Sequence, residues 1–312
     1  MLSIELYTQA DRALWDDFVR RSRNGTFLFE RDYMEYHADR FADFSLIVRD
    51  GGAPIALLPA NRRGKIAESH GGLTYGGFVL GPRLTTLRMI EVLAATAGFL
   101  REQGIGLLRY RAIPHVYHGS PAGEDLFALS ASGARLVHRA ALSVLDPGMP
   151  LTVQERRRRA LQKASRAGLE AFESTDLEAY WTLLEEVLDK RHGARPVHSL
   201  AEIRLLRQRF PQSIRLFSTT FKGRMIAGVL VYETPRVARA QYIAASAVGR
   251  DLGALDLILR SLVGAVFAGK RYIDLGTSEG QGAAGLNEGV IQFKEGLGAR
   301  TVAQDTYELP IA

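Results

Sequence analysis

Short hydrophobic runs on either side of a glycine-containing turn occur in both halves of the chain. The paired runs are Leu46–Arg49 with Ile55–Pro59, and Ile214–Phe221 with Met225–Tyr232. The turns between them contain Asp50-Gly51 and Lys222-Gly223. A turn of this composition between two β-like runs is typical of a β-hairpin. The pattern therefore predicts one hairpin in each half.

Each hairpin is followed by a third β-like run, an amphipathic helix and a buried strand. In the first half these are Leu73–Leu80, Thr86–Gln103 and Gly106–Ala112; in the second they are Ala238–Ala245, Gly253–Ala268 and Arg271–Gly276. Gly104 and Gly269 are placed to end the two helices. The repeated order predicts two copies of one unit, with two unrelated α/β domains as the alternative.

Two prolines and a glycine interrupt the hydrophobic pattern at Leu145–Pro150, which predicts a domain boundary there. We expect domains over residues 1–146 and 147–312. Each is expected to be an α/β (α+β) unit with a mixed, mostly antiparallel sheet flanked by helices. Further helices are predicted at Thr152–Gly168, opened by a capping box of Thr152 and Glu155, and at Asp176–Lys190 and Leu200–Phe210.

The amino-acid composition limits the kinds of catalytic and ligand-binding site that the chain can have. The 312 residues include 40 Lys and Arg, 34 Asp and Glu and no cysteine, for a net charge of +6. The absence of cysteine excludes thiolate nucleophiles, cysteine-ligated zinc and iron–sulfur clusters. No export signal opens the chain, and no apolar run approaches the ~20 residues of a membrane span. We therefore expect a cytoplasmic protein without a membrane span, whose mild positive charge suits anionic ligands.

Much of the positive charge lies on one predicted helix. Arg156, Arg159, Lys163 and Arg166 recur at spacings of three and four residues, so they share one helical face. A diphosphate, a nucleotide or an RNA backbone would neutralise them. A solvated basic face is the alternative.

A second anion site is predicted where a strand meets a helix. Arg250, Gly253 and Ala254 lie at this junction, and glycine there lets backbone N–H groups approach a pyrophosphate at the helix N-terminus. These residues are the candidates for donor binding. A glycine that only caps the helix is the alternative.

Polar residues also follow the last predicted strand of the second half. Asp274 ends this strand, and a glycine-rich loop leads to Asn287, Glu288 and then Lys294. The ends of strands in α/β sheets often carry sites, and this many glycines suit close approach of a ligand. Lys294 is the cation placed to meet an acyl or phosphate oxygen, with an ordinary surface lysine as the alternative.

Two further segments supply candidate substrate contacts. One is the loop with Arg191, His192, Arg195 and His198, in which histidine suits a general base near neutral pH; an ordinary exposed loop is the alternative. The spacing of its histidines matches no zinc signature, and we expect no metal. The other is a glycine-rich run with His70 and Tyr75, for which a glycine-lined domain interface is the alternative. No GxSxG, Walker A or repeated GxGxxG motif occurs.

These motifs together resemble the Fem-type peptidyltransferases and the acetyltransferase-like proteins found beside polysaccharide genes, both of which have the GNAT (N-acetyltransferase) fold. The matching segments are Arg156–Gly168, Arg191-His192-Gly193, Gly253-Ala254, Tyr272–Gly276, Phe293-Lys294, Gly296-Leu297-Gly298 and, in the first half, His70–Gly77. The resemblance covers most of the chain. It implies two tandem GNAT-like domains, with the acyl-transfer site in the second.

The resemblance also implies acyl transfer to an amine. Fem-type enzymes take aminoacyl groups from tRNA and act on a UDP-linked or lipid-linked cell-wall precursor; by position, Lys163 would help to hold diphosphate and Lys294 would lie at the transfer site. Ordinary GNAT enzymes place coenzyme A pyrophosphate on an Arg/Gln-x-x-Gly-x-Gly/Ala loop. Arg250 and Gly253 match that loop, whereas Leu255 replaces its last small residue.

Three functions fit the sequence. The first is an N-acyltransferase that uses acetyl-CoA or another acyl-CoA on an amino-sugar, nucleotide-linked or amino-acid-derived amine. The second is a Fem-like transferase that uses aminoacyl-tRNA, with tRNA as a partner, in cell-envelope or polysaccharide biosynthesis. The third is a non-catalytic module that binds nucleotide-linked glycans or RNA. Lys294 would stabilise the oxyanion, and His192, Asp274 or a substrate phosphate would accept the proton.

Overall fold

The computed structural model of the chain describes residues 1–311, apart from the side chains of Arg191, His192 and Ala283. It forms two compact units. Unit 1 comprises residues 1–140 and the C-terminal segment from Ala303, and unit 2 comprises residues 141–302. The end of the chain thus returns to unit 1, which no local sequence pattern indicates.

Unit 1 contains two runs of paired strands. The first run, in spatial order, is β1 (Leu2–Leu6), β2 (Leu46–Asp50), β3 (Ala53–Leu58) and β6 (Val79–Leu80). The second is β4 (Asn61–Arg63), β5 (Ile66–Glu68), β7 (Leu107–Arg111) and β14 (Arg300–Pro310). β14 joins β7 through Thr306–Pro310, in antiparallel register. The predicted hairpin is confirmed as β2–β3.

In the described residues unit 1 has four α-helices, and the last two of them contribute to one hydrophobic core. The four helices are α1 (Arg12–Arg21), α2 (Arg31–Met34), α3 (Thr86–Glu102) and α4 (Glu124–Ala131). Alternate strand residues such as Leu46, Val48, Ala56 and Leu58 face Met89, Val92 and Leu93 of α3 in that core. The predicted strand Leu73–Leu80 is wrong except for its last two residues. Glycines at 71, 72, 76 and 77 weaken strand pairing, and this segment is mostly loop.

Unit 2 is built on a second sheet. Its strands in spatial order are β8 (Arg135–Leu145), β13 (Tyr272–Thr277), β12 (Val237–Ala245), β11 (Arg224–Glu233), β10 (Ile214–Phe221) and β9 (Phe172–Ser174). β8 joins this sheet through Leu142–Leu145. The predicted hairpin is confirmed as β10–β11, and β12 and β13 form a parallel pair. The order of hairpin, strand, helix and strand therefore occurs in both units, as predicted.

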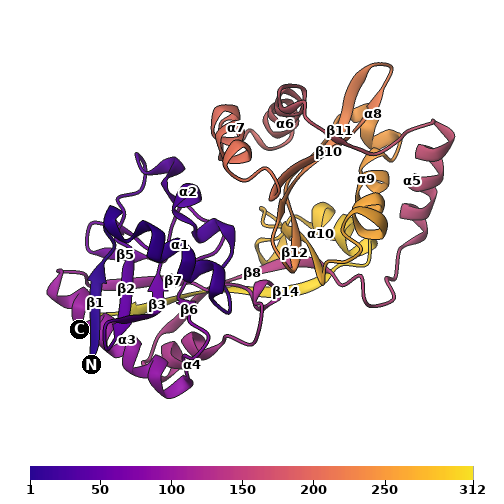
Figure 1. The fold of residues 1–312 in the computed structure, drawn as a ribbon. Helices are drawn as coiled ribbons and strands as arrows, with labels where there is room; N and C mark the ends of the chain where they lie inside the picture. Colours follow the sequence, from indigo (N-terminus) through magenta and orange to yellow (C-terminus); the bar gives the residue numbers. More distant parts are fainter. Residues whose placement is uncertain (312) are drawn as a thin grey trace. The chain divides into compact units, whose positions relative to one another are not determined.

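Helices cover both faces of the sheet in unit 2 (Figure 1). On one face lie α6 (Leu177–His192) and α7 (Leu200–Arg209); on the other lie α5 (Glu155–Arg166) and α9 (Ala254–Ser261), which continues as a π-helix over Leu262–Val266. α8 (Ala247–Asp251) and α10 (Glu288–Gly296) complete the unit. The predicted capping box at Thr152 is wrong, because Gln154 precedes α5 and its amide donates to the carbonyl of Gly296.

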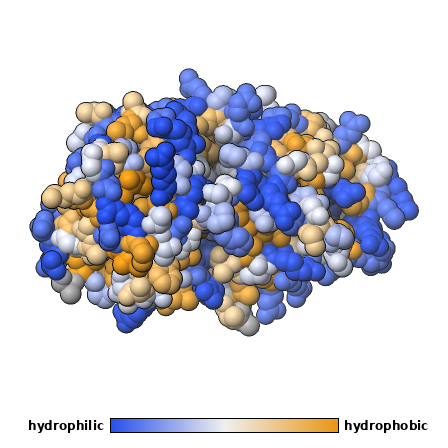
Figure 2. Space-filling model, turned by 60° about the horizontal axis from the view of Figure 1, so that its bottom comes forward, coloured by the Kyte–Doolittle hydropathy of each residue, from blue (hydrophilic) through white to orange (hydrophobic). Residues whose placement is uncertain are grey.

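The surface in Figure 2 is mostly hydrophilic, with smaller hydrophobic patches between the charged side chains. None of the helices in the described part of the chain is long and apolar enough to cross a membrane.

Candidate acyl-transfer site

The candidate site lies where β12 and β13 separate in unit 2. These parallel strands pair only from Val237 with Tyr272 to Arg239 with Asp274, although β12 continues to Ala245 and β13 to Thr277. The register also shifts in β11–β12 beside Leu230, and in β13–β8 after Asp274. Such irregularities often lie next to active sites, where they redirect side chains.

Side chains at the point of separation face the α6 side of the sheet. Paired residues point to the same face, so the pairs Leu230–Tyr242, Tyr232–Arg239 and Arg239–Asp274 share one face. The face is that of α6, because Trp181 of α6 contacts the Tyr242 ring edge-on, with centroids 5.5 Å apart.

Asp274 is a fully buried carboxylate with two kinds of partner. One oxygen forms an ion pair with the Arg239 guanidinium, and the other accepts a hydrogen bond of 2.7 Å from the amide of Gly276. Its side chain is 0% exposed. A buried charge persists only when it is paired and hydrogen-bonded, and Arg239 and Gly276 meet both conditions for the Asp274 carboxylate.

Lys294 of α10 reaches the same end of β13 and is only 4% exposed. Its Nζ donates to the carbonyls of Gly276 at 3.0 Å and Thr277 at 2.6 Å. Burial lowers the pKa of Lys294 to about 8; the Asp274 charge opposes this shift and the Arg239 charge adds to it. The structure thus brings together two of the predicted catalytic residues, Lys294 and Asp274, since both bond to the Gly276 backbone.

A second polar pair lies on the same face. The Tyr242 hydroxyl lies 2.6 Å from Nδ1 of His198 and accepts a hydrogen bond of 3.2 Å from the His198 amide. Burial raises the pKa of Tyr242 to about 12, so the phenol keeps its proton at neutral pH. His198 precedes α7, whose capping Ser199 accepts from the amide of Glu202, and the helix start thus positions the imidazole.

The junction before α9 does not have the open geometry that pyrophosphate binding needs. Gly253 has φ of +75°, and a Cβ on it would lie 2.8 Å from the carbonyl carbon of Ala160 in α5 and closer still to its oxygen. Helix packing therefore accounts for this glycine. Arg250 donates 2.7 Å to the carbonyl of Ala245 within its own turn, and Ala254 is buried in the core.

A carboxylate also lies in the first turn of α9. Asp256 forms an ion pair with Arg157 of α5, whose Nη1 lies 3.1 and 3.2 Å from the two carboxylate oxygens. Burial raises the pKa of Asp256, and Arg157 opposes the shift. Asp256 is thus already neutralised by Arg157, and the close packing of α5 against Gly253 is what disfavours a diphosphate at this helix end.

We expect Gly253→Ala to destabilise the chain by about 3 kcal/mol, because the methyl group meets the α5 backbone and φ is positive. Gly168→Ala is the matched control: Gly168 has φ of +66° with open space around its Cβ position, and its cost should be about 1 kcal/mol. Chemical denaturation measures both losses. Equal losses would show that close packing of α5 is not what requires Gly253.

The basic residues of α5 are partly neutralised within unit 2. Arg156 donates to the carbonyl of Gln292 at 2.8 Å, and Lys163 pairs with Asp251 at 2.8 Å. Arg159 and Arg166 are exposed, and neither forms an ion pair within the described residues. The predicted stripe of four cations thus leaves two available to an external anion.

The other predicted contacts of unit 2 are placed as follows. Asn287 caps α10, since its side chain accepts from the amide of Val290 at 3.1 Å. Glu288 and Arg195 are exposed. The side chains of Arg191 and His192 lie outside the described residues.

The two predicted contacts of unit 1 are buried. His70 lies against Phe41 and His37, with ring centroids 5.5 and 5.4 Å away, and burial lowers its pKa to about 3. The Tyr75 hydroxyl is 3.1 Å from Oγ1 of Thr26, and its ring contacts Tyr117. Both side chains contribute to packing within unit 1.

Arg239 and Tyr242 are site residues that the sequence analysis missed. His198 belongs to the loop that the sequence singled out, although the base was assigned there to His192. One signal was available: Arg239, Gln241 and Tyr242 interrupt a strand that is otherwise apolar, between Ala238 and Ala245. Within the described residues, no group of three or more His, Asp or Glu side chains is arranged to hold a metal.

Comparison with known proteins assigns this architecture. The family described as "Acetyltransferase (GNAT) domain" matches residues 153–288, which lie within unit 2. Unit 2 is a GNAT acyltransferase domain. No curated protein matches the sequence at a significant level.

Solved structures extend the GNAT fold to the whole chain. FemX superposes with a TM-score of 0.72 at 12% identity over 99% of this chain and 97% of FemX. The C-terminal domain of a putative lysylphosphatidylglycerol synthetase from Agrobacterium fabrum gives 0.61 at 14% identity over 96% and 92%. A tandem GNAT protein of the clavulanic acid pathway gives 0.54 at 13% identity over 100% and 99%. The predicted Fem-type fold with tandem GNAT-like units is thus confirmed. The prediction of an acyltransferase is supported by the family match within unit 2.

Proposed function

We propose that the chain transfers an aminoacyl group from aminoacyl-tRNA to an amine at the point where β12 and β13 separate. The observation that carries the proposal is the group formed at β13 by the buried Lys294 and Asp274 with the partly buried Arg239. Acyl transfer to an amine develops negative charge on the carbonyl oxygen, and a fixed cation in a site shielded from water stabilises it well.

Lys294 supplies that cation. An ammonium group has three N–H donors, and two of them hold the carbonyls of Gly276 and Thr277. The third is left for the oxyanion. With a pKa of about 8, most of the lysine is charged at pH 7, and the ionised Asp274 favours that charged state.

The attacking amine must lose its proton. We assign this proton to His198, with Tyr242 as the group that orients the imidazole, because imidazole suits base catalysis near neutral pH. Asp274 is already bonded to Arg239 and to the Gly276 amide, so its role is to hold the charge of the site.

The closed junction before α9 favours tRNA as donor. The activated group of an aminoacyl-tRNA is a ribose ester, and this donor has no diphosphate, whereas coenzyme A has one at the far end of its pantetheine arm. Gly253 is packed against the Ala160 backbone of α5, so a diphosphate is disfavoured here. The exposed Arg159 and Arg166 would instead contact the tRNA backbone.

Transfer from acetyl-CoA or another acyl-CoA is the second candidate function. The match of residues 153–288 to the GNAT acetyltransferase domain favours it. For either donor we propose a small-molecule or nucleotide-linked amine as acceptor. A cytoplasmic role in envelope or polysaccharide biosynthesis agrees with the similarity to FemX and to the lysylphosphatidylglycerol synthetase.

Donor binding distinguishes the two candidates. We expect bacterial aminoacyl-tRNA to bind with an affinity that falls steeply with salt, and to transfer its aminoacyl group to a nucleotide-linked amine in an RNase-sensitive reaction. Acetyl-CoA should leave the melting temperature unchanged. If acyl-CoA is the donor, a concentration of 100 times its Kd should stabilise the fold by about 2.7 kcal/mol.

A pair of variants locates the tRNA surface. Arg159→Gln/Arg166→Gln should weaken tRNA binding, whereas Lys222→Gln/Arg224→Gln, in the β10–β11 turn, removes the same charge and should not. A melting shift with acetyl-CoA, together with no binding of aminoacyl-tRNA, would overturn the choice of donor.

A further inference from the structure

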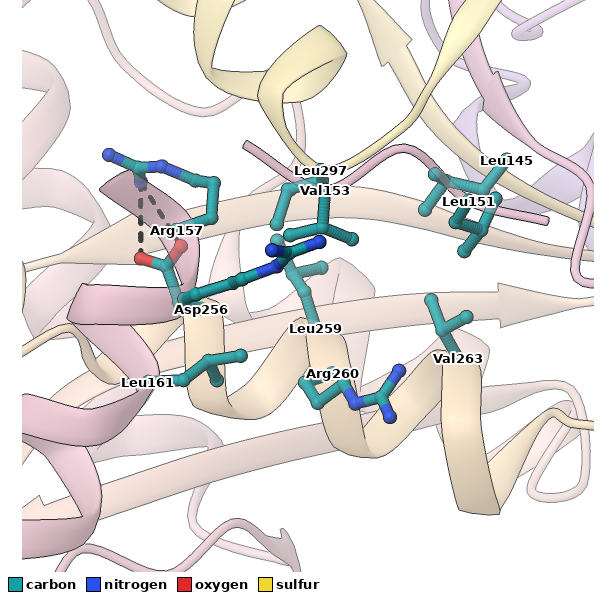
Figure 3. A pocket seen from close by; sticks show the side chains of 11 residues that line it. Leu145, Leu151, Val153, Arg157, Leu161, Asp256, Leu259, Arg260, Val263 and Leu297 are labelled. Atoms are coloured by element: carbon teal, nitrogen blue, oxygen red, sulfur yellow. Dashed lines mark hydrogen bonds and ion pairs between the residues drawn. The ribbon is translucent and has the colours of Figure 1, made fainter. Parts of the chain in front are cut away.

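A cavity of about 270 Å³ lies between α5, α9 and the segment that follows β8 (Figure 3). Its walls are mainly aliphatic: Leu145, Leu151, Val153, Leu161, Leu259, Val263 and Leu297. Its charged lining residues are Arg157, Arg158, Asp256 and Arg260. The cavity is just below the usual range of about 300–1,000 Å³ for small-molecule pockets, so its size suits one short chain.

The cavity is separate from the candidate acyl-transfer site. Leu259 packs against Val229 and Val231 in the core on the α9 face of the sheet. Side chains alternate along a strand, so Leu230 and its partner Tyr242 point to the opposite face. A ligand here would leave Tyr242 and Asp274 unobstructed.

Most of the aliphatic side chains that line the cavity are not fully buried within the chain. Leu145 and Leu259 are buried, but Leu151, Val153, Leu161, Val263 and Leu297 are each partly exposed. A concave site with exposed apolar side chains favours the binding of an apolar group, because burying apolar surface away from water lowers the free energy. A hydrocarbon chain matches these walls.

Two arginines provide charge without a strong internal partner. Arg158 is 3.7 Å from Glu155, and its side chain is 63% exposed. Arg260 is exposed, and no residue in the described part of the chain forms an ion pair with it. By contrast, Arg157 is bound to Asp256 (Figure 3). The cavity thus has free positive charge beside its apolar walls and a neutralised pair at Arg157.

The backbone of α9 also changes form at this cavity. The α-helix ends at Ser261 and continues as a π-helix over Leu262–Val266, which contains the lining residue Val263. π-Helical turns are rare and frequently mark functional sites.

We propose that this cavity binds a single hydrocarbon chain that ends in an anionic group, a carboxylate or a phosphate. The chain contacts the leucine and valine side chains, and the anion pairs with Arg158 and Arg260. This site binds an effector or an acyl-bearing molecule independently of the proposed amine acyl transfer.

Titration calorimetry with hexanoate, octanoate and decanoate, all below micelle formation, tests the proposal. Affinity should rise about fourfold for each methylene that enters the cavity, and decyl phosphate should bind like decanoate. Decylammonium should not bind, because Arg158 and Arg260 repel it. Equal binding of decanoate and decylammonium, or no binding of decanoate, would refute the site.

Variants then locate the ligand. Arg158→Gln/Arg260→Gln should lower decanoate affinity about tenfold, whereas the matched Lys222→Gln/Arg224→Gln should leave it unchanged. Val263→Phe should reduce decanoate affinity more than hexanoate affinity, because it fills the cavity. Thermal melting of each variant shows that it is folded. If Arg158→Gln/Arg260→Gln and Lys222→Gln/Arg224→Gln bound decanoate with equal affinity, the assignment of the anion to Arg158 and Arg260 would be overturned.

Discussion

Lys294→Met is expected to lower kcat of acyl transfer by about 10²–10³-fold, the usual cost of removing one oxyanion donor. Methionine keeps most of the volume of the lysine stem in its buried position at the end of β13, but it has no N–H group. The Gly276 and Thr277 carbonyls then lose their donor, and the developing oxyanion loses its cation. Single-turnover transfer at saturating donor measures the chemical step.

Lys270→Met is the matched control. Lys270 also donates to a backbone carbonyl, that of Thr234 at 2.8 Å, and pairs with Glu233, but it is not part of the proposed site. Its removal should leave kcat within about twofold of the wild type. A fully active, folded Lys294→Met variant would contradict the assignment of the oxyanion donor.

The pH dependence gives an independent measurement. With a pKa of about 8, Lys294 loses its charge at a lower pH than the ordinary value of 10.5, so kcat should fall as pH rises above about 8. The unfolding free energy should change with pH in the direction opposite to kcat. Between pH 8 and 10.5 the unfolded chain holds a proton that the folded chain has lost, so the unfolding free energy rises with pH, relative to Lys294→Met, by about 3 kcal/mol.

The secondary-structure elements that could be predicted from the sequence are those determined by local sequence patterns. The hairpins, the helices and β13 follow from hydrophobic spacing, and Lys294 and Asp274 stood out because they lie near glycines at a strand end. The ion pair between Arg239 and Asp274 could not be predicted from the sequence. It depends on the register of two strands 35 residues apart in the sequence, which no local pattern specifies.

Glycines were the weakest indicators of a functional site in the sequence, because close packing of a neighbouring helix and close approach of a ligand both require glycine. Gly253 suggested a phosphate loop, yet the backbone of α5 fills the space beside it. Gly276, with φ of +76°, does lie in the site and follows the last β12–β13 pair. The difference depends on what packs against each glycine, and only the three-dimensional structure shows this.

Asp274→Asn should cost about 3–5 kcal/mol of unfolding free energy, because it removes the buried carboxylate that pairs with the partly buried Arg239 guanidinium. The amide keeps the shape of the carboxylate and an oxygen that accepts from Gly276, so the loss reports charge rather than volume. The Asp274 charge normally raises the pKa of Lys294. Its removal should lower that pKa below 8, and the fall of kcat with pH should begin at lower pH.

Two comparisons separate these effects. Glu178→Gln removes the partner of Arg204 in an exposed ion pair, and it should cost less than about 1 kcal/mol. The double variant Arg239→Met/Asp274→Asn should recover part of the stability lost by Asp274→Asn, because no buried charge is then left without a partner. Its kcat should fall with pH at a pH between those of Asp274→Asn and the wild type, because removing Arg239 also removes a charge that lowers the pKa of Lys294. If Asp274→Asn alone kept the wild-type pH profile of kcat, Asp274 would act only through folding, and the charge of Lys294 would not depend on it.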